Sequence, residues 1–391
     1  MKVAVIGAGI AGITAAYYLA RQGNDVTVYE QERYPAMQTS FANGGQVSVS
    51  NSEVWTTWSN VFKGAKWVFQ KDAPLLIRPR LDWQMFKWLF KFLFHTVRGD
   101  YTKNTKTTIQ MGLASRELYN EIINEEKLES FDQSYNGILH FYKDGTYWDA
   151  AVKAKTIYDE SNCEWSLIDG FQVNTYDPAL KDIQGVIGGV VTKDDWTGDI
   201  HKFCKLLTNK LITKYKVEFC FDTKITHLIK DLAGYDRIIV ANGVGSVALA
   251  NTIGDSLDIY PVKGYSITIN ATDKKSIAAL PKVSLLDDQA KIVTATLGTR
   301  LRVAGTAEFT GENYDIRRDR IEPLLNWVHE NLPNIDTSNY SSWACLRPMT
   351  ANMMPIVRQS KKNPKVFYHT GHGHLGWTLA PFTAKQLSEL I

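Results

Sequence analysis

The chain opens with Lys2-Val-Ala-Val-Ile-Gly7-Ala-Gly9-Ile-Ala-Gly12 and, after a stretch rich in Ala, Tyr and Leu, continues with Asp25-Val-Thr-Val-Tyr-Glu30. An apolar strand that runs into a G-x-G-x-x-G turn, followed by a helix and a second strand ending in an acid, is typical of the βαβ unit that binds a dinucleotide. The order of these pieces is more specific than the glycines alone. The sequence therefore predicts an α/β fold with a Rossmann-like domain.

Each residue of this motif has a physical task. Gly7 allows the tight turn, Gly9 lets the backbone approach a pyrophosphate, and Gly12 lets the helix pack closely on the strand. The N-terminus of the helix then faces the phosphates. Glu30 is expected to accept hydrogen bonds from the adenosine ribose.

Composition limits the possible functions. The chain has 391 residues, enough for two domains, and its net charge of +3 without a dense cluster of Lys or Arg argues against a nucleic-acid partner. The cysteines lie far apart, so they indicate neither a disulfide framework nor a metal site, and a reducing cytoplasm fits them. The sequence contains no apolar run of about eighteen residues, so it predicts no membrane-spanning helix.

Patterns typical of a nucleotide domain recur far from the N-terminus. A strand runs into the turn Ala241-Asn-Gly243, and a glycine-rich stretch from Thr370 to Gly376 precedes a last helix that we expect from about Pro381. Alternating residues between 265 and 304 predict an antiparallel sheet. Further helices are expected over residues 107–126, 147–161, 199–215 and 318–331.

These patterns predict a discontinuous nucleotide domain with a second domain inserted into it. The nucleotide domain is expected to comprise residues 1–50, 196–255 and 336–391. The inserted α+β substrate domain, built on the antiparallel sheet, is expected to comprise residues 51–195 and 256–335.

Other motifs occur in a defined order along essentially the whole chain. They are Thr39-Ser40-x-Ala42-Asn43-x-Gly45-Gln46, Gln70-x-x-Ala73-Pro74, Thr197-Gly198-Asp199, Pro261-x-Lys263-Gly264-Tyr265-Ser266, Leu346-Arg347-Pro348-Met349-Thr350 and Thr370-Gly371-His372-Gly373-x-Leu375-Gly376-Trp377-Thr378. Together with the opening motif, this set resembles the bacterial FAD-dependent D-amino acid dehydrogenases of the D-amino acid oxidase and glycine oxidase superfamily. The resemblance implies oxidative deamination of a D-amino acid by hydride transfer to N5 of a non-covalent FAD, yielding a 2-oxo acid and ammonia.

The resemblance also implies which residues surround FAD. Small residues and an amide in the loop at Asn43 would bring donors close to the cofactor, and the glycines after Thr370 would line the flavin. The expected cofactor-binding residues are Gly7, Gly9, Gly12, Glu30, Ser40, Asn43, Gly44, Gly45, Gln46, Ala241, Gly243, Gly371, Gly373, Leu375, Gly376, Trp377 and Thr378.

Three residues are expected to act on the substrate. Arg347 is the main candidate, because a guanidinium pairs with a carboxylate through two parallel hydrogen bonds and relatives use this arginine in that way. Tyr265 is a second candidate through its hydroxyl, although a strand tyrosine is more often a core residue. His374 lies where some relatives place another polar contact, although it could instead satisfy a backbone carbonyl.

Departures from the family pattern leave the substrate open. The chain has Ala351-Asn-Met-Met354-Pro355 where relatives continue with Pro-Asp-Gly-x-Pro, Thr296 where an arginine is expected, and Cys345 in place of a glycine. A glycine or sarcosine-type oxidase that uses oxygen, and a flavoprotein that has lost its activity, therefore stay as alternatives.

The region 54–98 combines many aromatic residues with many Lys and Arg residues. In its helical part, polar residues such as Lys87 and Lys91 form a narrow stripe, and Trp88, Phe90 and Phe92 belong to a wide apolar remainder. Such a face suits a membrane surface, with basic residues reaching anionic head groups. One hypothesis is a cytoplasmic protein bound to the inner face of the membrane that reduces a quinone. The alternative is a helix buried against the substrate domain.

Overall fold

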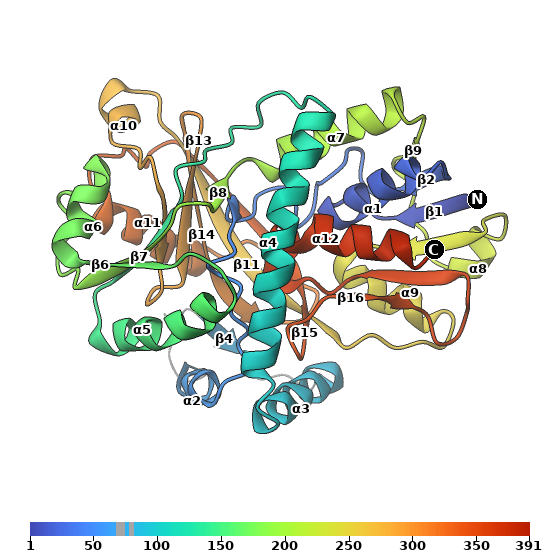
Figure 1. Ribbon diagram of the computed structural model, residues 1–391, viewed down its shortest axis with the longest axis horizontal. Coiled ribbons are helices and arrows are strands. Elements are labelled where there is room, and N and C mark those ends of the chain that lie inside the picture. The colour runs from blue at the N-terminus through green and yellow to red at the C-terminus, as the bar shows by residue number, and fades with distance from the viewer. Residues whose placement is uncertain (68–74, 78–81) are drawn as a thin grey trace.

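The computed structural model describes residues 1–67, 75–77 and 82–391, and Figure 1 shows a nucleotide part and a substrate part side by side. The Gln70-x-x-Ala73-Pro74 motif lies outside the described residues. Strands from distant parts of the sequence meet in each part, so the α/β fold with a discontinuous nucleotide part is confirmed.

The nucleotide part is built on a six-stranded sheet. In spatial order its strands are β16 (Ile356–Gln359), β17 (Val366–Thr370), β10 (Arg237–Val240), β1 (Lys2–Ile6), β2 (Asp25–Tyr29) and β9 (Glu218–Cys220). All neighbours are parallel except β16 and β17. Because β1 lies in the middle, four of its five residues are buried, which explains its uninterrupted apolar sequence.

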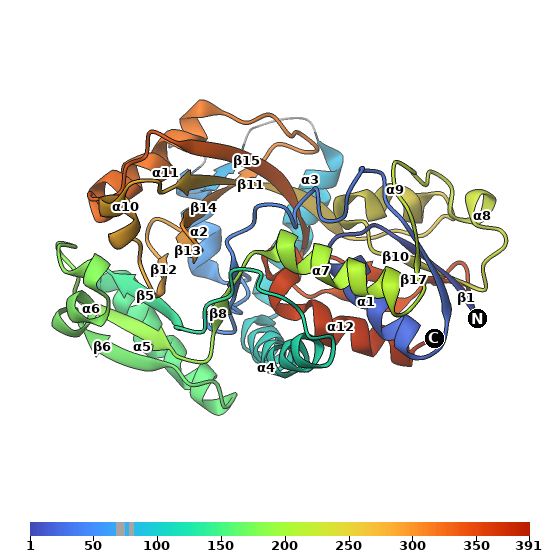
Figure 2. The ribbon, with the colours of Figure 1, turned by 90° about the horizontal axis from the view of Figure 1, so that it is seen from above.

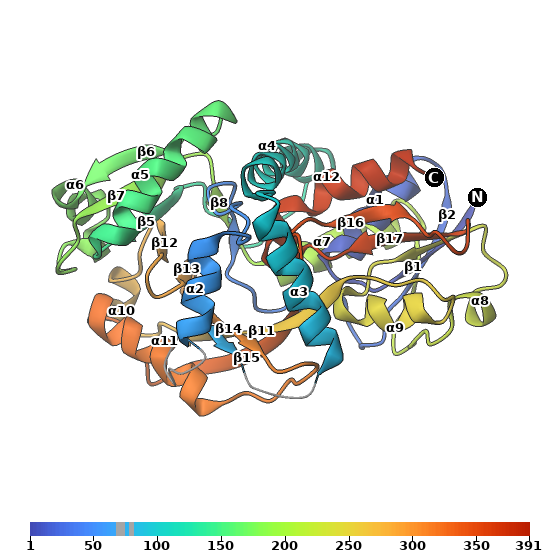
Figure 3. The ribbon, with the colours of Figure 1, turned by 90° about the horizontal axis from the view of Figure 1, so that it is seen from below.

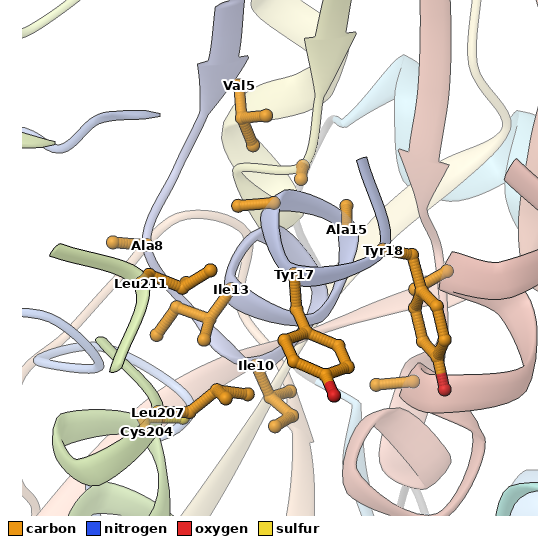
Figure 4. Packing of buried hydrophobic residues seen from close by; sticks show 14 of the residues in the cluster. Val5, Ala8, Ile10, Ile13, Ala15, Tyr17, Tyr18, Cys204, Leu207 and Leu211 are labelled. Carbon is orange, nitrogen blue, oxygen red and sulfur yellow. The ribbon is translucent and has the colours of Figure 1, made fainter. Parts of the chain in front are cut away.

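Helices α1 (Ile10–Arg21), α7 (Ile200–Thr213) and α12 (Gly376–Glu389) pack together beside this sheet. Figure 4 shows Ile10 and Ile13 of α1 close to Leu207 and Leu211 of α7. All four side chains belong to one buried cluster. This packing fixes the N-terminus of α1 at the end of β1.

Helix α4 (Tyr101–Glu125) crosses the junction of the two parts and supports α12 (Figure 1). Because Pro381 has no N–H, it leaves the carbonyl of Trp377 without its usual helical donor. The hydroxyl of Tyr119 in α4 donates to that carbonyl at 2.5 Å. With this carbonyl paired, Pro381 lies inside α12. The helix begins at Gly376, five residues before the expected start at Pro381.

The substrate part is built on a curved nine-stranded sheet, visible from above in Figure 2. Its strands in order are β15 (Tyr340–Thr350), β11 (Ile259–Asn270), β14 (Arg300–Phe309), β13 (Ile292–Leu297), β12 (Ser284–Asp287), β5 (Ile138–Tyr142), β7 (Gly188–Thr192) and β6 (Ser166–Asp169), with β4 (Leu75–Ile77) beside β14. Helix α11 (Arg318–Asn331) has the expected bounds, and its buried side chains join one face of this sheet.

The remaining elements are short or peripheral. They are β3 (Gln46–Val47), α2 (Trp58–Trp67), α3 (Trp83–Val97), α5 (Gly145–Glu160), α6 (Gly170–Tyr176), η1 (Pro178–Leu180), β8 (Trp196–Thr197), α8 (Leu228–Asp231), η2 (Gly243–Gly245), α9 (Ser246–Asn251), α10 (Lys274–Ala278) and η3 (Gly373–Leu375). In the described ranges, no helix is both long enough and apolar enough to span a bilayer.

Two segments pack in the other part of the molecule from the one in which the sequence placed them. Strand β15 pairs with β11 along its whole length, so it belongs to the substrate sheet, and the nucleotide part resumes at β16 rather than at residue 336. Tyr119 and Ile122 of α4 lie in the core of the nucleotide part, although residues 51–195 were expected in the substrate domain.

Candidate active site

The glycine turn after β1 leaves no room for side chains. Gly7 has a φ of +99°, and a Cβ added to it would lie 2.8 Å from the Cα of Asn242. A Cβ on Gly12 would overlap the carbonyl of Gly7. The N–H of Ala8 donates to the buried carboxylate of Glu30 at 2.7 Å, and burial raises the pKa of Glu30. Glu30, which directly follows β2, thus fixes the backbone of the glycine turn through this hydrogen bond.

The segment from Ser40 to Gly45 runs from the start of α1 to the substrate sheet. The N–H of Ile10 donates to Oγ of Ser40 at 3.1 Å. A Cβ on Gly44 would lie 2.6 Å from Cγ2 of Val293, and one on Gly45 would lie 2.6 Å from Cβ of Ala295. Glycine at both positions therefore lets this loop pack closely against β13 of the substrate sheet.

Two further turns lie at the carboxyl ends of the neighbouring strands β10 and β17. Oγ1 of Thr370 donates to the carbonyl of Gly243 at 3.1 Å, which joins the two turns. Gly371 and Gly373 have φ values of +75° and +58°, conformations that favour glycine. The glycine turns after β1, β10 and β17 therefore meet at one edge of the sheet, where α/β proteins bind nucleotides.

Several expected cofactor-binding side chains are engaged in packing. Trp377 lies inside α12, 2% exposed, with its ring centroid 5.6 Å from that of Trp196. Oγ1 of Thr378 accepts from the N–H of Ser48 at 3.2 Å. The amide of Gln46 donates to Ser284 at 2.8 Å. Leu375 is buried and Gly376 begins α12, so this stretch shapes the turn mainly through its backbone.

Arg347 lies on β15 with its guanidinium packed directly on Gly264 of β11. A Cβ on Gly264 would overlap the guanidinium. Nη1 of Arg347 donates to the carbonyl of Thr306 at 3.1 Å. Among the described residues no carboxylate lies within ion-pair distance of Arg347, and burial lowers its pKa. Arg347 is half-buried, and a guanidinium that is withdrawn from water without a counter-ion favours the binding of an anion.

Thr306 presents its carbonyl to Arg347 from a bulge in β14. The register between β11 and β14 shifts between Lys263 and Tyr265, and Thr306 has a φ of +60°. This conformation is costly for a β-branched residue. The strain thus lies at the residue whose carbonyl accepts a hydrogen bond from the arginine.

His374 lies close to Arg347. An antiparallel bridge joins Met349 of β15 to His372, and Arg347 and His374 each lie two residues beyond it. The ring of His374 stacks on Trp55, with centroids 4.8 Å apart. Burial, together with the positive charge of Arg347, lowers the pKa of His374 to about 4.

The polar atoms of His374 are available to a ligand. Both ring nitrogens are buried, and neither completes a hydrogen bond with a described residue, although the backbone of Asn51 lies nearby. A neutral imidazole offers one donor and one acceptor. Arg347 thus offers donors for a carboxylate, and His374 offers a neutral acceptor beside it for an amino group. This pair of groups suits an amino acid.

Tyr265 lies on the opposite face of β11 from Arg347. Val262 pairs with Arg347, so Val262 and Gly264 share its face and Tyr265 points away. The hydroxyl of Tyr265 donates to the buried Glu308 at 2.5 Å, within the core beneath α11. The expectation that Tyr265 contacts substrate was wrong, because the parity of the strand turns it to the other side.

Comparisons with known proteins agree with this arrangement. The family model described as FAD dependent oxidoreductase matches residues 2–390. The chain belongs to this family. It is 44% identical over 405 residues to D-amino acid dehydrogenase 3 of Mesorhizobium japonicum, covering 100% of this chain and 97% of the relative. It is 34% identical to a D-amino acid dehydrogenase of Rhizobium rhizogenes, covering 100% and 96%.

The fold is also shared with solved flavoenzymes. Glycine oxidase of Geobacillus kaustophilus superposes with a TM-score of 0.75 at 16% sequence identity, covering 99% of this chain and 93% of that one. As a member of the FAD-dependent oxidoreductase family, the chain takes FAD as its cofactor.

Proposed function

We propose that the chain is an FAD-dependent D-amino acid dehydrogenase whose substrate carboxylate binds Arg347. The observation that carries the proposal is the half-buried guanidinium of Arg347, which has no carboxylate partner among the described residues and lies beside the unpaired ring of His374. The named activity of the relatives with 44% and 34% identity supports the same reaction.

FAD, when bound, accepts the hydride from Cα of the substrate. We assign its pyrophosphate to the N-terminus of α1 at Gly9, its adenosine ribose to Glu30, and its ring system to the Asn43–Gly45 loop and the turn at Gly371. Ser40 supports the loop by accepting from Ile10.

The protein orients the substrate through its carboxylate and its amino group. Arg347 holds the α-carboxylate, with its guanidinium fixed by Gly264 and the carbonyl of Thr306. His374 accepts a hydrogen bond from the α-amino group, since its low pKa keeps the ring neutral. The amine must be neutral for hydride to leave Cα, and water then hydrolyses the imino acid to a 2-oxo acid and ammonia.

The electron acceptor that we propose is a quinone in a membrane bound by α3. The inner row of this helix is buried, with Nε1 of Trp88 donating to the carbonyl of Met349 at 2.8 Å. An outer row is exposed, including Trp83 at 82% and Phe90 at 72%. The inner face is thus buried, as the alternative expected, and the exposed aromatic residues of the outer face support our proposal of peripheral attachment at the cytoplasmic side.

The test is anaerobic bleaching of the flavin absorbance by a panel of D-amino acids. We expect bleaching without rapid peroxide formation in air, and a protein that no D-amino acid bleaches would contradict the proposal. Replacing Arg347 with Lys removes the paired hydrogen bonds, so the substrate dissociation constant is expected to rise about 10- to 100-fold. FAD content should stay constant, and equal loss of substrate and FAD binding would count against the role of Arg347.

A further inference from the structure

Arg302 of β14 is buried beneath the loop that contains Asn43, with only 5% of its surface exposed. Its Nη1 donates to the carbonyl of Asn43 at 3.1 Å, and its Nε donates to Oγ1 of Thr268 at 2.7 Å. Oγ of Ser266, two residues before Thr268 on β11, donates to the carbonyl of Ala42 at 2.7 Å. Side chains of β11 and β14 thus hold the backbone of this loop against the substrate sheet.

The positive charge of Arg302 has no counter-ion in the part of the chain that the structure describes. Both acceptors of its guanidinium are neutral oxygen atoms, and no carboxylate of a described residue lies within ion-pair distance. Arg300 on the same strand differs, because its Nη2 contacts Asp132 at 2.6 Å and Asp199 at 2.9 Å. A buried cation without an anion is costly, and a ligand that brings negative charge close to it offsets that cost.

Arg302 and Arg347 lie on the same face of the substrate sheet. Arg347 packs on Gly264 and Arg302 donates to Thr268, and these two positions of β11 point to the same side because they are four residues apart. Helix α11 covers the opposite face (Figure 3). Four residues of a strand span about 13 Å, so Arg302 is not a second ligand of the carboxylate that we assign to Arg347.

We propose that the positive charge of Arg302 stabilises the reduced state of bound FAD and so raises its reduction potential. This inference rests on the proposed function, because it takes the flavin ring to lie against the Asn43–Gly45 loop. Arg302 acts from behind that loop and is therefore a positioning residue.

The need for a counter-charge follows from the balance of hydride transfer. The Cα–H bond breaks, an N–H bond forms at N5, and the lone pair of the neutral amine completes the C=N bond of the imino acid. Two electrons and one proton enter the flavin, so its ring system gains one negative charge. A fixed positive charge on the protein favours that state without having to reorganise during the reaction.

The pyrophosphate is the other anionic group of FAD, and it lies at the other end of the loop in our assignment. Ser40 contacts the first turn of α1, where we place the pyrophosphate, whereas Arg302 contacts the loop at Asn43. The charge of the pyrophosphate is the same in oxidised and reduced FAD. A residue that pairs with the pyrophosphate therefore changes the affinity for FAD but leaves its reduction potential unchanged.

The first experiment measures the reduction potential of protein-bound FAD against a reference dye under anaerobic conditions, with no amino acid present. We expect a higher potential than that of free FAD in the same buffer. Arg302→Gln keeps a donor for Asn43 but loses the charge, so it should shift the equilibrium toward oxidised FAD at least tenfold, which is about 30 mV for a two-electron couple. Arg302→Lys keeps the charge and should shift it less than threefold.

The matched control is Arg318→Met on α11, which removes an equal charge from a side chain that is 91% exposed. It should shift the equilibrium less than threefold. An unchanged potential in Arg302→Gln, or an equal fall in Arg302→Gln and Arg302→Lys, would overturn the proposal. The unaltered protein gives an answer even if Arg302→Gln does not fold, because a potential at or below that of free FAD also overturns it.

The second experiment measures the dissociation constant of oxidised FAD from each variant. We expect Arg302→Gln to change it less than threefold. A tenfold loss of affinity at an unchanged potential would show that Arg302 pairs with the pyrophosphate or only supports the loop, and the proposal would be wrong. Neither experiment uses an amino acid, so a protein that no D-amino acid reduces would contradict the proposed function without altering these results.

Discussion

The guanidinium of Arg347 lies so close to Gly264 that a single methyl group on Gly264 would overlap it. The two residues are on adjacent strands, β15 and β11, and on the same face of the sheet. The position of the proposed carboxylate-binding group thus depends on the absence of a side chain on its neighbour.

Replacing Gly264 with Ala should therefore displace Arg347 without removing it. We expect kcat/KM for the amino acid to fall by about 100-fold or more, because a displacement of about 1 Å is enough for such a loss. FAD content, measured by absorbance, should not change. Gly145→Ala is the matched control, since a Cβ there would meet open space. Unchanged kcat/KM in the Gly264 variant would contradict the assigned role of Arg347.

His374 can be tested with a substitution that keeps an aromatic ring against Trp55. His374→Phe removes the nitrogen that accepts a hydrogen bond from the amino group, so kcat/KM should fall by about 100-fold, the loss expected when a substrate is displaced by about 1 Å. In the unaltered protein the pKa of His374 is about 4, so kcat/KM should rise with pH only as the substrate ammonium loses its proton. An additional titration near pH 6.5 that disappears in His374→Phe would show that the ring is not held neutral.

Arg347 and Tyr265 show what the sequence can and cannot reveal about this site. Arg347 could be proposed because a charged residue within an ordered motif has a chemical reason to be there, and the structure leaves it without a carboxylate partner among the described residues. Tyr265 was misassigned because a change of one position along a strand reverses the face of the sheet, and the parity depends on pairing with distant β15. The glycine turn was predictable because its whole unit lies within residues 2–30.

The contact between Thr306 and Arg347 could not be predicted from the sequence. Thr306 accepts through its carbonyl at a bulge, and a backbone contact leaves no mark in residue type. Trp55 belonged to an aromatic region that was interpreted as a membrane surface, although its own ring stacks on His374.

The outer face of α3 should be required for membrane binding, and its inner face for folding. Trp88 is 5% exposed, so replacing it tests stability rather than attachment. The double substitution Trp83→Ser and Phe90→Ser should lower partition onto anionic liposomes at least tenfold in co-sedimentation, since each buried aromatic contributes about 1.5–3 kcal/mol. Phe171→Ser, which alters a 79% exposed Phe on α6, is the control. Equal partition of both variants would exclude α3 as the attachment site.

Glu126 is expected to be an anchor between α1, α4 and α7. Its buried carboxylate accepts from the hydroxyls of Tyr17 at 3.2 Å and Tyr215 at 2.6 Å, and from Nζ of Lys214 at 2.9 Å. Glu126→Gln should lower the free energy of unfolding by about 1–3 kcal/mol, because it weakens charge-assisted hydrogen bonds. Glu125→Gln, at an exposed position beside it, should change it by less than about 0.5 kcal/mol. Urea unfolding of the two variants compares them directly.

A buried histidine pair should make the protein sensitive to acid. Nε2 of His369 and of His372 both lie 2.9 Å from Oγ1 of Thr383 in α12. Burial lowers the pKa of His369, and it lowers that of His372 to about 4. Folding therefore favours the neutral rings, and their contribution is fully present above the unfolded pKa of about 6.5 and is lost as the pH falls toward 4.

The expected slope in that range is up to about 1.4 kcal/mol per pH unit for each histidine. Urea unfolding at pH 7, 6 and 5 should show a steep loss of stability in the unaltered protein and a shallower one in His372→Asn. The comparison concerns slopes, so a variant that is less stable at pH 7 still gives a clear answer. Identical slopes would mean that His372 titrates alike in the folded and unfolded chains, and that its burial beside Thr383 does not exclude the charged form.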